Sequence, residues 1–417
     1  MRIKSIMNLK KFIIFLFIIS LCLIDTTSCN SRKENTIKFL YYFDSTKEKG
    51  AIVELFKEFE RDFNCSIDLI LYDYSRGPDE LISMLQNKDK FDVIAFDSEW
   101  FGQMKESGIL YVLTTGENFK ENSFTPALLD YCKFNGKYYC LPWLIDSRFL
   151  YINEKITNEF KLDSKPSNLQ ELLTNVELIN ESGKYYGISL VGANKQYTLK
   201  NLLPFIYSFG GQLVDSNSNS ILNHRNNLPG FYYYLKLGNS GIFETKREAE
   251  NLFMNGKSGY CITDLSLFQK ILKSNAEDKY LLVPIPGNNR NKSFYANAVM
   301  LGINKQSCKK ELSTKLIEYL CSWENSDNYT VELLKYGVPA DLNFSCKFID
   351  KNIYSMMIEQ IKNPVMAARY MYWYNIETVI ESEFEKVIYS EKSIEASLND
   401  AQEEVITQMK KIKKRQE

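Results

Sequence analysis

Three short apolar runs follow one another near the start of the chain: IKFLYYF at Ile37–Phe43, IDLILY at Ile67–Tyr72 and FDVIAF at Phe91–Phe96. Each has the length and composition of a buried strand. Residues 45–59, with apolar side chains on one helical face, separate the first two runs, and a helix-like segment at Pro78–Asn87 separates the last two. This β-α-β-α-β order is typical of a parallel sheet with right-handed crossovers, so the sequence predicts an α/β fold.

The ends of these strands carry acidic and aromatic side chains. Asp44 follows the first run, and Phe96, Glu99 and Trp100 surround the end of the third. Because ligands of open α/β sheets bind beyond the carboxyl ends of the strands, we expect these residues at a ligand site.

Two later segments also place aromatic rings beside polar groups. Trp143 lies three residues before Asp146, and Trp373 lies within the aromatic segment Tyr370–Tyr374. Aromatic rings stack on the C–H faces of sugars, and carboxylates and amides bond to sugar hydroxyls. A single aromatic residue is more often a core residue, but the repetition of the pattern in separate parts of the chain favours a sugar site.

Composition excludes several other classes of function. The chain has 417 residues, 45% of them hydrophobic and 25% charged, which is typical of a globular protein of two or three domains. Its net charge of -1 argues against a nucleic-acid-binding protein, which usually has a strong basic excess. Aromatic residues reach 14%, whereas His224 is the single histidine of the sequence. A catalytic site centred on histidine would have to use that residue, and a metal site with several histidines is excluded.

The first 28 residues resemble an export signal. Basic residues precede the uncharged, largely apolar run Phe12–Ile24, which is too short to span a bilayer comfortably and ends at Asp25. The following Thr26-Thr27-Ser28-Cys29 is similar to a bacterial lipoprotein cleavage site, so we expect lipidation at Cys29. Ordinary secretion or a retained anchor are the alternatives.

Seven cysteines remain once Cys22 is removed and Cys29 is lipidated. They show no spacing typical of a zinc site. Cys132 and Cys140 flank Asn135-Gly136, a strong hairpin signal, and could therefore oppose each other across a turn. Buried free cysteine is the more frequent state.

Familiar enzyme motifs are incomplete or missing. Gly256-Lys257-Ser258 ends like a phosphate-binding loop, but the motif needs a glycine where Asn251 stands. Asp215, Asn217 and Asn219 alternate as in a calcium loop that lacks its turn glycine and its final glutamate, so a polar surface turn is the better interpretation. The sequence contains no G-x-S-x-G or H-E-x-x-H motif. A glycosidase pair of carboxylates is not excluded by sequence.

The order of segments resembles that of extracellular solute-binding proteins of bacterial ABC importers, specifically the maltose-type carbohydrate-binding family. The most specific segment is GKYYCLPW at Gly136–Trp143, which continues to Leu150–Asn153. Pro284–Gly287 followed by Val299–Ile303 matches a second signature. The resemblance covers Ile37–Gln408.

This resemblance implies a type II periplasmic-binding fold, in which two α/β lobes joined by a hinge enclose a cleft. The expected lobes are residues 36–145 plus about 267–345, and residues 146–266 plus about 346–417. The implied protein is not an enzyme and needs no cofactor or metal. It is an exported, lipid-anchored monomer that passes a sugar or oligosaccharide to the membrane permease of an ABC transporter.

The resemblance also implies a set of site residues. Asp44 and Asp146 match ligand-facing acids, and Trp373 matches a sugar-stacking tryptophan. The full candidate set is Asp44, Phe96, Glu99, Trp100, Trp143, Asp146, Tyr197, Asp264, Asn297 and Trp373.

Two departures from the family pattern bear on the ligand. Side chains at Ala296-Asn297-Ala298 replace paired glycines, and Trp100 replaces a basic contact, so the ligand need not be a maltooligosaccharide. A non-sugar solute on the same fold and a secreted glycoside hydrolase remain the alternatives.

Overall fold

The computed structural model describes residues 35–43, 50–86, 91–116, 119–163, 165–192, 197–288, 295–344, 350–362 and 364–416. Cys29, Asp44, Cys346 and the apolar run Phe12–Ile24 lie outside these residues. Within them, no helix has the length and apolar character needed to cross a membrane.

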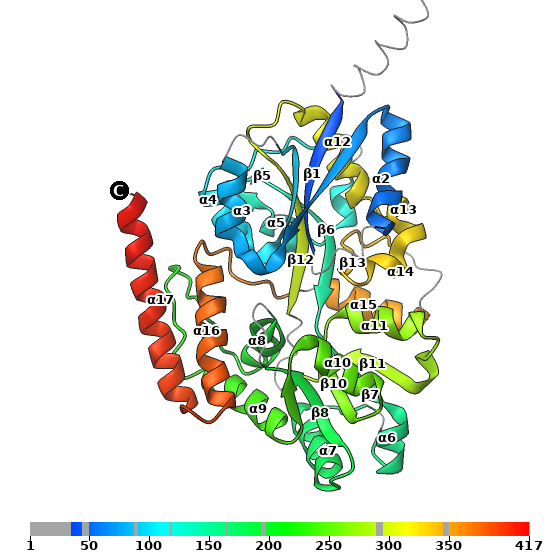
Figure 1. Cartoon of the computed structure of the whole chain (residues 1–417), viewed down its shortest axis with the longest axis vertical. Helices are drawn as coiled ribbons and strands as arrows, with labels where there is room; N and C mark the ends of the chain where they lie inside the picture. Colours follow the sequence, from blue (N-terminus) through cyan, green and yellow to red (C-terminus); the bar gives the residue numbers. More distant parts are fainter. Residues whose placement is uncertain are drawn as a thin grey trace, which may run out of the picture.

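The described residues form two α/β lobes, each built on its own sheet (Figure 1). The first sheet has the order β13-β6-β12-β3-β1-β2. Its strands are β1 (Thr36–Phe43), β2 (Ser66–Asp73), β3 (Val93–Asp97), β6 (Leu141–Ser147), β12 (Ala296–Ile303) and β13 (Val338–Pro339). β1 runs parallel to both β2 and β3, which confirms the predicted β-α-β-α-β unit. β12 is antiparallel to β3 and β6, so the sheet is mixed.

The second sheet has the order β11-β7-β10-β8-β9. Its strands are β7 (Phe149–Asn153), β8 (Tyr186–Val191), β9 (Ile242–Glu244), β10 (Ser258–Thr263) and β11 (Tyr280–Pro284). β8 is parallel to β9 and β10, whereas β7 is antiparallel to its two neighbours.

The lobe limits expected from the sequence differ from the strand order at one point. β11 lies inside the range 267–345 expected in the first lobe, but it pairs with β7 at the edge of the second sheet. The chain therefore returns along the second sheet before it crosses to β12. It crosses between the lobes three times: between β6 and β7, between β11 and β12, and between α15 and α16.

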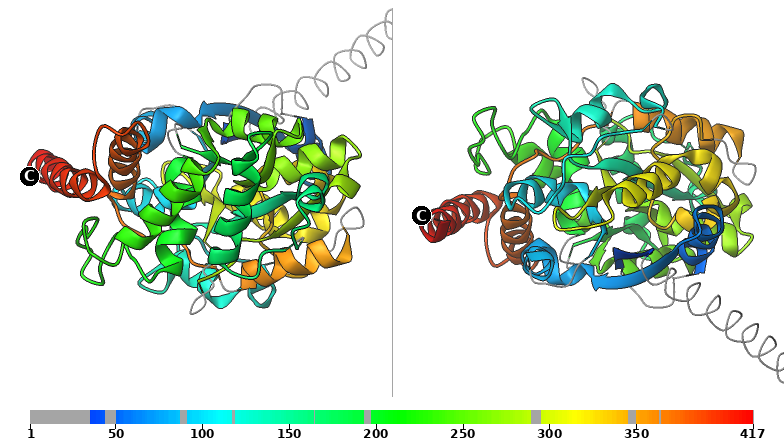
Figure 2. Two further views of the ribbon diagram at one scale, coloured as in Figure 1. Left: turned by 90° about the horizontal axis from the view of Figure 1, so that it is seen from below. Right: turned by 90° about the horizontal axis from the view of Figure 1, so that it is seen from above.

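Helices cover the sheets of both lobes. Those associated with the first lobe are α2 (Gly50–Phe63), α3 (Gly77–Gln86), α4 (Phe101–Glu106), α5 (Pro126–Tyr131), α12 (Lys310–Cys321), α13 (Trp323–Ser326), α14 (Thr330–Leu333) and α15 (Lys351–Lys362), with the 3-10 turns η2 (Tyr74–Arg76), η3 (Ser98–Trp100), η4 (Glu121–Ser123) and η6 (Asp327–Tyr329). The remaining helices are α6 (Glu154–Glu159), α7 (Leu169–Glu181), α8 (Thr198–Ser208), α9 (Leu228–Asn239), α10 (Lys246–Met254), α11 (Leu265–Lys273), α16 (Trp373–Ile388) and α17 (Ile394–Gln416), with η5 (Glu277–Lys279). Figure 2 shows α16 and α17 side by side at one end of the molecule.

Local sequence explains several of these boundaries. Ile52, Leu55 and Phe59 of α2 are buried, as the 3.6-residue spacing predicts. Thr125 accepts a hydrogen bond from the Leu128 N–H and so caps α5, whose first residue is proline.

The hairpin predicted at Asn135-Gly136 is present. It joins β4 (Lys133–Phe134) to β5 (Lys137–Tyr138), and both turn residues have positive φ, as a type I′ turn requires. Cys132 and Cys140 flank it as buried free thiols.

Candidate functional site

A polar cavity lies between the two lobes. Its lining residues come from strands of the first sheet and from helices and loops of both lobes: Tyr42, Tyr74, Asp97, Asp146, Arg148, Tyr197, Lys200, Lys246, Asp264, Asn297, Lys335 and Tyr336. Its volume is about 70 Å3, far below the roughly 300–1,000 Å3 of typical ligand sites. The lobes are therefore closed on each other, and a ligand the size of a sugar requires them to separate.

Aromatic rings form the first-lobe wall of this cavity. Tyr42 at the end of β1 packs on Tyr74 of η2, with ring centroids 5.2 Å apart. Tyr74 in turn stacks on Trp100, with centroids 4.8 Å apart and ring planes 12° from parallel. Trp100 is fully buried behind Tyr74, so the tyrosine presents the ring that lines the cavity.

Two ion pairs form the wall nearest the β6–β7 crossing. Arg148 Nη1 lies 2.6 Å from Asp146 Oδ2, and Lys246 Nζ lies 2.5 Å from Asp264 Oδ2. Asp264 also caps α11 by accepting a hydrogen bond from the Ser266 N–H. The ammonium of Lys246 stands 5.0 Å from the centroid of the Tyr197 ring, within range of a cation–π contact.

These pairs leave the two aspartates in different electrostatic states. Burial raises the pKa of Asp146 to about 6, against the attraction of Arg148. Burial also disfavours the ionised form of Asp264, but Lys246 and Arg148 outweigh it and lower the pKa of Asp264 well below its usual range. Near neutral pH the wall offers carboxylate acceptors and cationic donors side by side.

A third ionic contact crosses from one lobe to the other. Lys200 of α8 places its Nζ 2.7 Å from Asp97 Oδ2 and 3.0 Å from Glu99 Oε2, both in the first lobe. It also donates a hydrogen bond of 2.8 Å to the Tyr74 hydroxyl. Burial opposes the charge of Lys200, but Asp97 and Glu99 outweigh this effect and raise its pKa well above the usual value.

The candidate residues fall into three groups. Four line the cavity: Asp146, Tyr197, Asp264 and Asn297. Five are buried and do not line it: Phe96, Glu99, Trp100, Trp143 and Trp373. Asp44 lies outside the described residues. Glu99 reaches the cavity only through its contact with Lys200. The structure therefore brings the candidate acids together more closely than the candidate tryptophans.

Sequence reasoning missed the basic residues of the site. Lys200 interrupts the helix TLKNLLPFIYS, all of whose other residues except Tyr207 are buried. A lysine on such a helix is a signal of a buried ion pair, because lysine is rarely fully buried without a partner. Arg148 and Lys246 gave no comparable signal.

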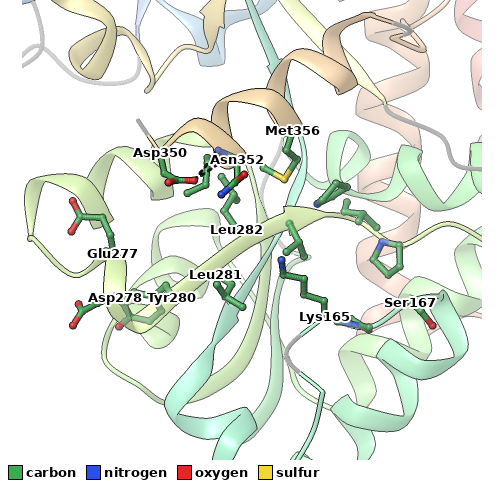
Figure 3. Close-up of a pocket in the computed structure, with 16 residues that line it drawn as sticks. Lys165, Ser167, Glu277, Asp278, Tyr280, Leu281, Leu282, Asp350, Asn352 and Met356 are labelled. Atoms are coloured by element: carbon green, nitrogen blue, oxygen red, sulfur yellow. Dashed lines mark hydrogen bonds between the residues drawn. The ribbon is translucent and has the colours of Figure 1, made fainter. Parts of the chain in front are cut away.

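A larger cavity of about 770 Å3 lies elsewhere, between the edge strand β11, α15 and the loop at Lys165–Ser167 (Figure 3). It shares no lining residue with the interlobe cavity. Its walls are mostly apolar, and the carboxylates of Glu277 and Asp278 lie on one rim, away from Lys165 (Figure 3). It lacks the convergent polar groups of the interlobe cavity, which is therefore the better candidate site.

The described residues give no indication of metal chemistry, because no three His, Cys, Asp or Glu side chains among them are placed to hold an ion. The interlobe cavity instead combines hydrogen-bonding charges with aromatic rings on walls from both lobes. Such a site suits the recognition of a polar ligand with apolar faces.

Comparison with known proteins gives an independent finding. The family model described as "Bacterial extracellular solute-binding protein" matches residues 44–325, which is more than half of the chain. A protein of Brucella abortus strain 2308, whose name describes it as a binding protein without stating a ligand, is 24% identical over 243 residues. That alignment covers 55% of this chain and 58% of the relative, so the match spans little more than half the relative's length.

Solved structures share the fold over nearly the whole chain. Maltose-bound MalE3 of T. maritima aligns with a TM-score of 0.76 at 17% identity, covering 89% of this chain and 99% of that protein. A solute-binding protein of Thermotoga lettingae bound with α-D-tagatose aligns with a TM-score of 0.77 at 20% identity, covering 89% and 98%. One of Agrobacterium radiobacter in complex with ribitol gives 0.75 at 17%, again covering 89% and 98%. These likenesses establish the two-lobed fold predicted from the sequence.

Proposed function

This chain belongs to the bacterial extracellular solute-binding proteins, and from that premise we propose that it captures a sugar or oligosaccharide between its lobes and delivers it to the membrane permease of an ABC transporter. The observation that carries the proposal is the interlobe cavity, whose polar and aromatic walls come from both lobes. The maltose, α-D-tagatose and ribitol bound by proteins of the same fold support a carbohydrate ligand.

The mechanism follows from the geometry of the walls. A pyranose ring that stacks on Tyr42 or Tyr74 leaves its hydroxyls free to bond to Asp146, Asp264 and Asn297. A ligand held by both lobes favours the closed state over the open one, and the permease then distinguishes the two. No covalent step is required, so the protein acts as a binder and not as an enzyme.

The cellular setting of the protein depends on its N-terminus. Cleavage before Cys29 and lipidation of that residue would hold the exported protein at the cell membrane as a monomer. Mass spectrometry of the protein purified from membranes tests this directly. A mature N-terminus other than a lipid-modified Cys29 would contradict it.

A thermal-shift screen against sugars and polyols tests the ligand class. At a ligand concentration of 100 Kd, binding stabilises the native state by about 2.7 kcal/mol. For a chain of this size that raises Tm by about 3 °C. Polyamines and sugar acids belong in the same screen, because three ion pairs reach the cavity and a charged solute is the competing possibility.

The screen has two further outcomes. A shift with polyamines or sugar acids alone would overturn the neutral-sugar proposal while leaving the fold and family in place. Oligosaccharides that raise Tm are also incubated with the protein, and steady release of product would show that it is a glycoside hydrolase instead.

A further inference from the structure

Lys200 lies at the centre of a buried contact between the lobes. Its helix, α8, belongs to the second lobe, whereas Asp97 and Glu99 belong to the first. The exposed fractions of the three residues are 3%, 2% and 2%. The ammonium of Lys200 therefore contacts two carboxylates of the other lobe directly.

We propose that Lys200, Asp97 and Glu99 form an intramolecular latch that closes the cleft in the absence of solute, and that a proton on Glu377 sets the pH range in which the latch holds. The inference concerns the regulation of the cleft and rests on the proposed function for its biological meaning. Its physical content, closure of the empty protein, does not depend on which solute is bound.

Glu377 stands beside the latch on α16, which packs against both α8 and η3. Its side chain is fully buried, and neither carboxylate oxygen has a hydrogen-bond partner among the described residues. A buried, ionised carboxylate without a partner is strongly disfavoured, whereas a protonated one is tolerated.

The charged groups around Glu377 come from both lobes. Asp97 and Glu99 face it from the first lobe, and Lys200 and Glu381 from the second. α17 packs along α16 through contacts such as the bond between Asn375 and Gln408, and Lys392 bridges Glu383 of α16 and Asp400 of α17. The cluster thus contains four carboxylates and one ammonium. Burial, followed by repulsion from Glu99 and Glu381, raises the pKa of Glu377 well above its usual value.

Phenol groups complete the surroundings of the latch. Tyr295 donates a hydrogen bond to Glu99 Oε1, and Tyr74 and Tyr207 lie close by. Burial raises the pKa of each of these phenols above its usual value, so they stay neutral when Glu377 titrates. Among these groups, a carboxyl group and not a phenol therefore gains or loses a proton at moderate pH.

The direction of the pH effect follows from linkage. Separation of the lobes hydrates Glu377 and removes Asp97 and Glu99 from its vicinity, so its pKa falls toward the ordinary value. The closed state therefore binds a proton that the open state releases, and closure weakens as pH rises between the two pKa values. For one proton the closed-to-open ratio changes by up to about tenfold per pH unit.

The test uses the full mature protein without any added solute. Small-angle X-ray scattering reports the separation of the lobes between pH 5 and pH 9, and tryptophan emission gives a second readout because Trp100 stacks on Tyr74 beside the latch. We expect a compact protein at pH 5 and, as pH rises, a larger radius of gyration with red-shifted emission.

Two variants test the ion pairs of Lys200 and the titration of Glu377 separately. Lys200→Met keeps the apolar stem and removes the ammonium, so it should open the protein throughout the pH range and lower the closed-to-open ratio by at least about tenfold. Glu377→Gln cannot ionise, so it should stay closed up to pH 9. Lys236→Met, in an exposed ion pair with Glu177, and Glu385→Gln on the same helix α16 are the matched controls.

Each outcome decides the inference. If Lys200→Met remains compact at every pH, Lys200 does not hold the lobes together. If Glu377→Gln opens as pH rises in the same way as the wild type, the group that controls closure is not Glu377. Circular dichroism verifies folding, and Glu99→Gln, which weakens the latch without removing Lys200, replaces Lys200→Met if that variant unfolds. If the variants behave as expected but no sugar binds the protein, the latch stands and only the proposed ligand is overturned.

Discussion

Asp264 serves two purposes, as an ionic partner of Lys246 and as the cap of α11. Its lowered pKa means that its ionised form stabilises the folded protein above pH 4, and that this contribution is lost as pH falls toward the folded-state pKa. We expect Asp264→Asn, which keeps a good capping residue, to lower the free energy of unfolding by about 3 kcal/mol at pH 7.

Urea unfolding measures this loss in the free energy of unfolding, and the same measurement at lower pH is the control. The difference between wild type and Asp264→Asn should shrink as pH falls below 4, because the Asp264 carboxylate of the unfolded chain then takes up a proton that the folded protein does not bind. Asp264→Ala should cost about 1 kcal/mol more than Asp264→Asn, since the cap is also lost. A pH-independent difference between wild type and Asp264→Asn would show that the charge of Asp264 does not contribute to stability.

At the scale of single residues, the sequence predicted the acids of the site better than its cations. Asp146 and Asp264 line the cavity, and Asn297 joins them from β12; their contact with a ligand stays a prediction. The sequence did not indicate Lys200, Arg148 and Lys246, because the carboxylate that pairs with a basic residue is known only once the fold is known. Trp100 lies behind Tyr74, and Trp143 and Trp373 are buried without lining the cavity, which no spacing along the chain could have indicated. The role of these tryptophans in binding stays a prediction.

At the scale of elements, α4 and the third crossing of the chain lie in close contact. A Cβ added at Gly102 of α4 would stand 2.7 Å from the Tyr370 carbonyl carbon, which belongs to the backbone and cannot turn aside. We expect Gly102→Ala to push the two segments apart and to lower the free energy of unfolding by about 1–3 kcal/mol.

Gly50→Ala in α2 is the matched control for that substitution. Among the described residues, no atom lies within 4 Å of a Cβ built at Gly50, so alanine should be neutral or stabilising by up to about 1 kcal/mol. Thermal unfolding of both variants gives the comparison. Equal effects would mean that the contact at Gly102 is not a constraint on the fold.

Periodicity predicted most elements within a few residues. The strand expected at Ile67–Tyr72 agrees with β2, and the helix-like segment at Pro78–Asn87 agrees with α3. β11 was the principal omission, because its sequence YLLVP has no polar alternation and leads straight into the Pro284–Gly287 segment. Its place at a sheet edge depends on pairing with β7, which lies more than a hundred residues earlier in the chain.

At the scale of the whole molecule, the second lobe depends on the C-terminal helices. Trp373, Ile376, Ile380 and Phe384 of α16 are buried in its core. Each side chain of this kind contributes about 1.5–3 kcal/mol when buried, so their sum is comparable with the 5–15 kcal/mol that stabilises a whole domain.

A chain that ends at Lys362 should therefore leave the second lobe unfolded, even though its sheet is complete. The expected signs are dye binding to exposed apolar surface and loss of the upper thermal transition. A chain that ends at Lys410 loses only Ile412 among half-buried apolar residues and should fold normally. Native-like unfolding of the shorter chain would contradict this dependence.

The order of the strands in the first sheet determines when that sheet can be completed during synthesis. β12 lies between β3 and β6 in the first sheet, yet it begins at residue 296, whereas β6 ends at residue 147. At about 5–20 residues per second, a ribosome needs roughly 7–30 s to make the intervening chain. Within that interval all five strands of the second sheet emerge. The lobe that begins the chain is therefore the one whose sheet is completed last.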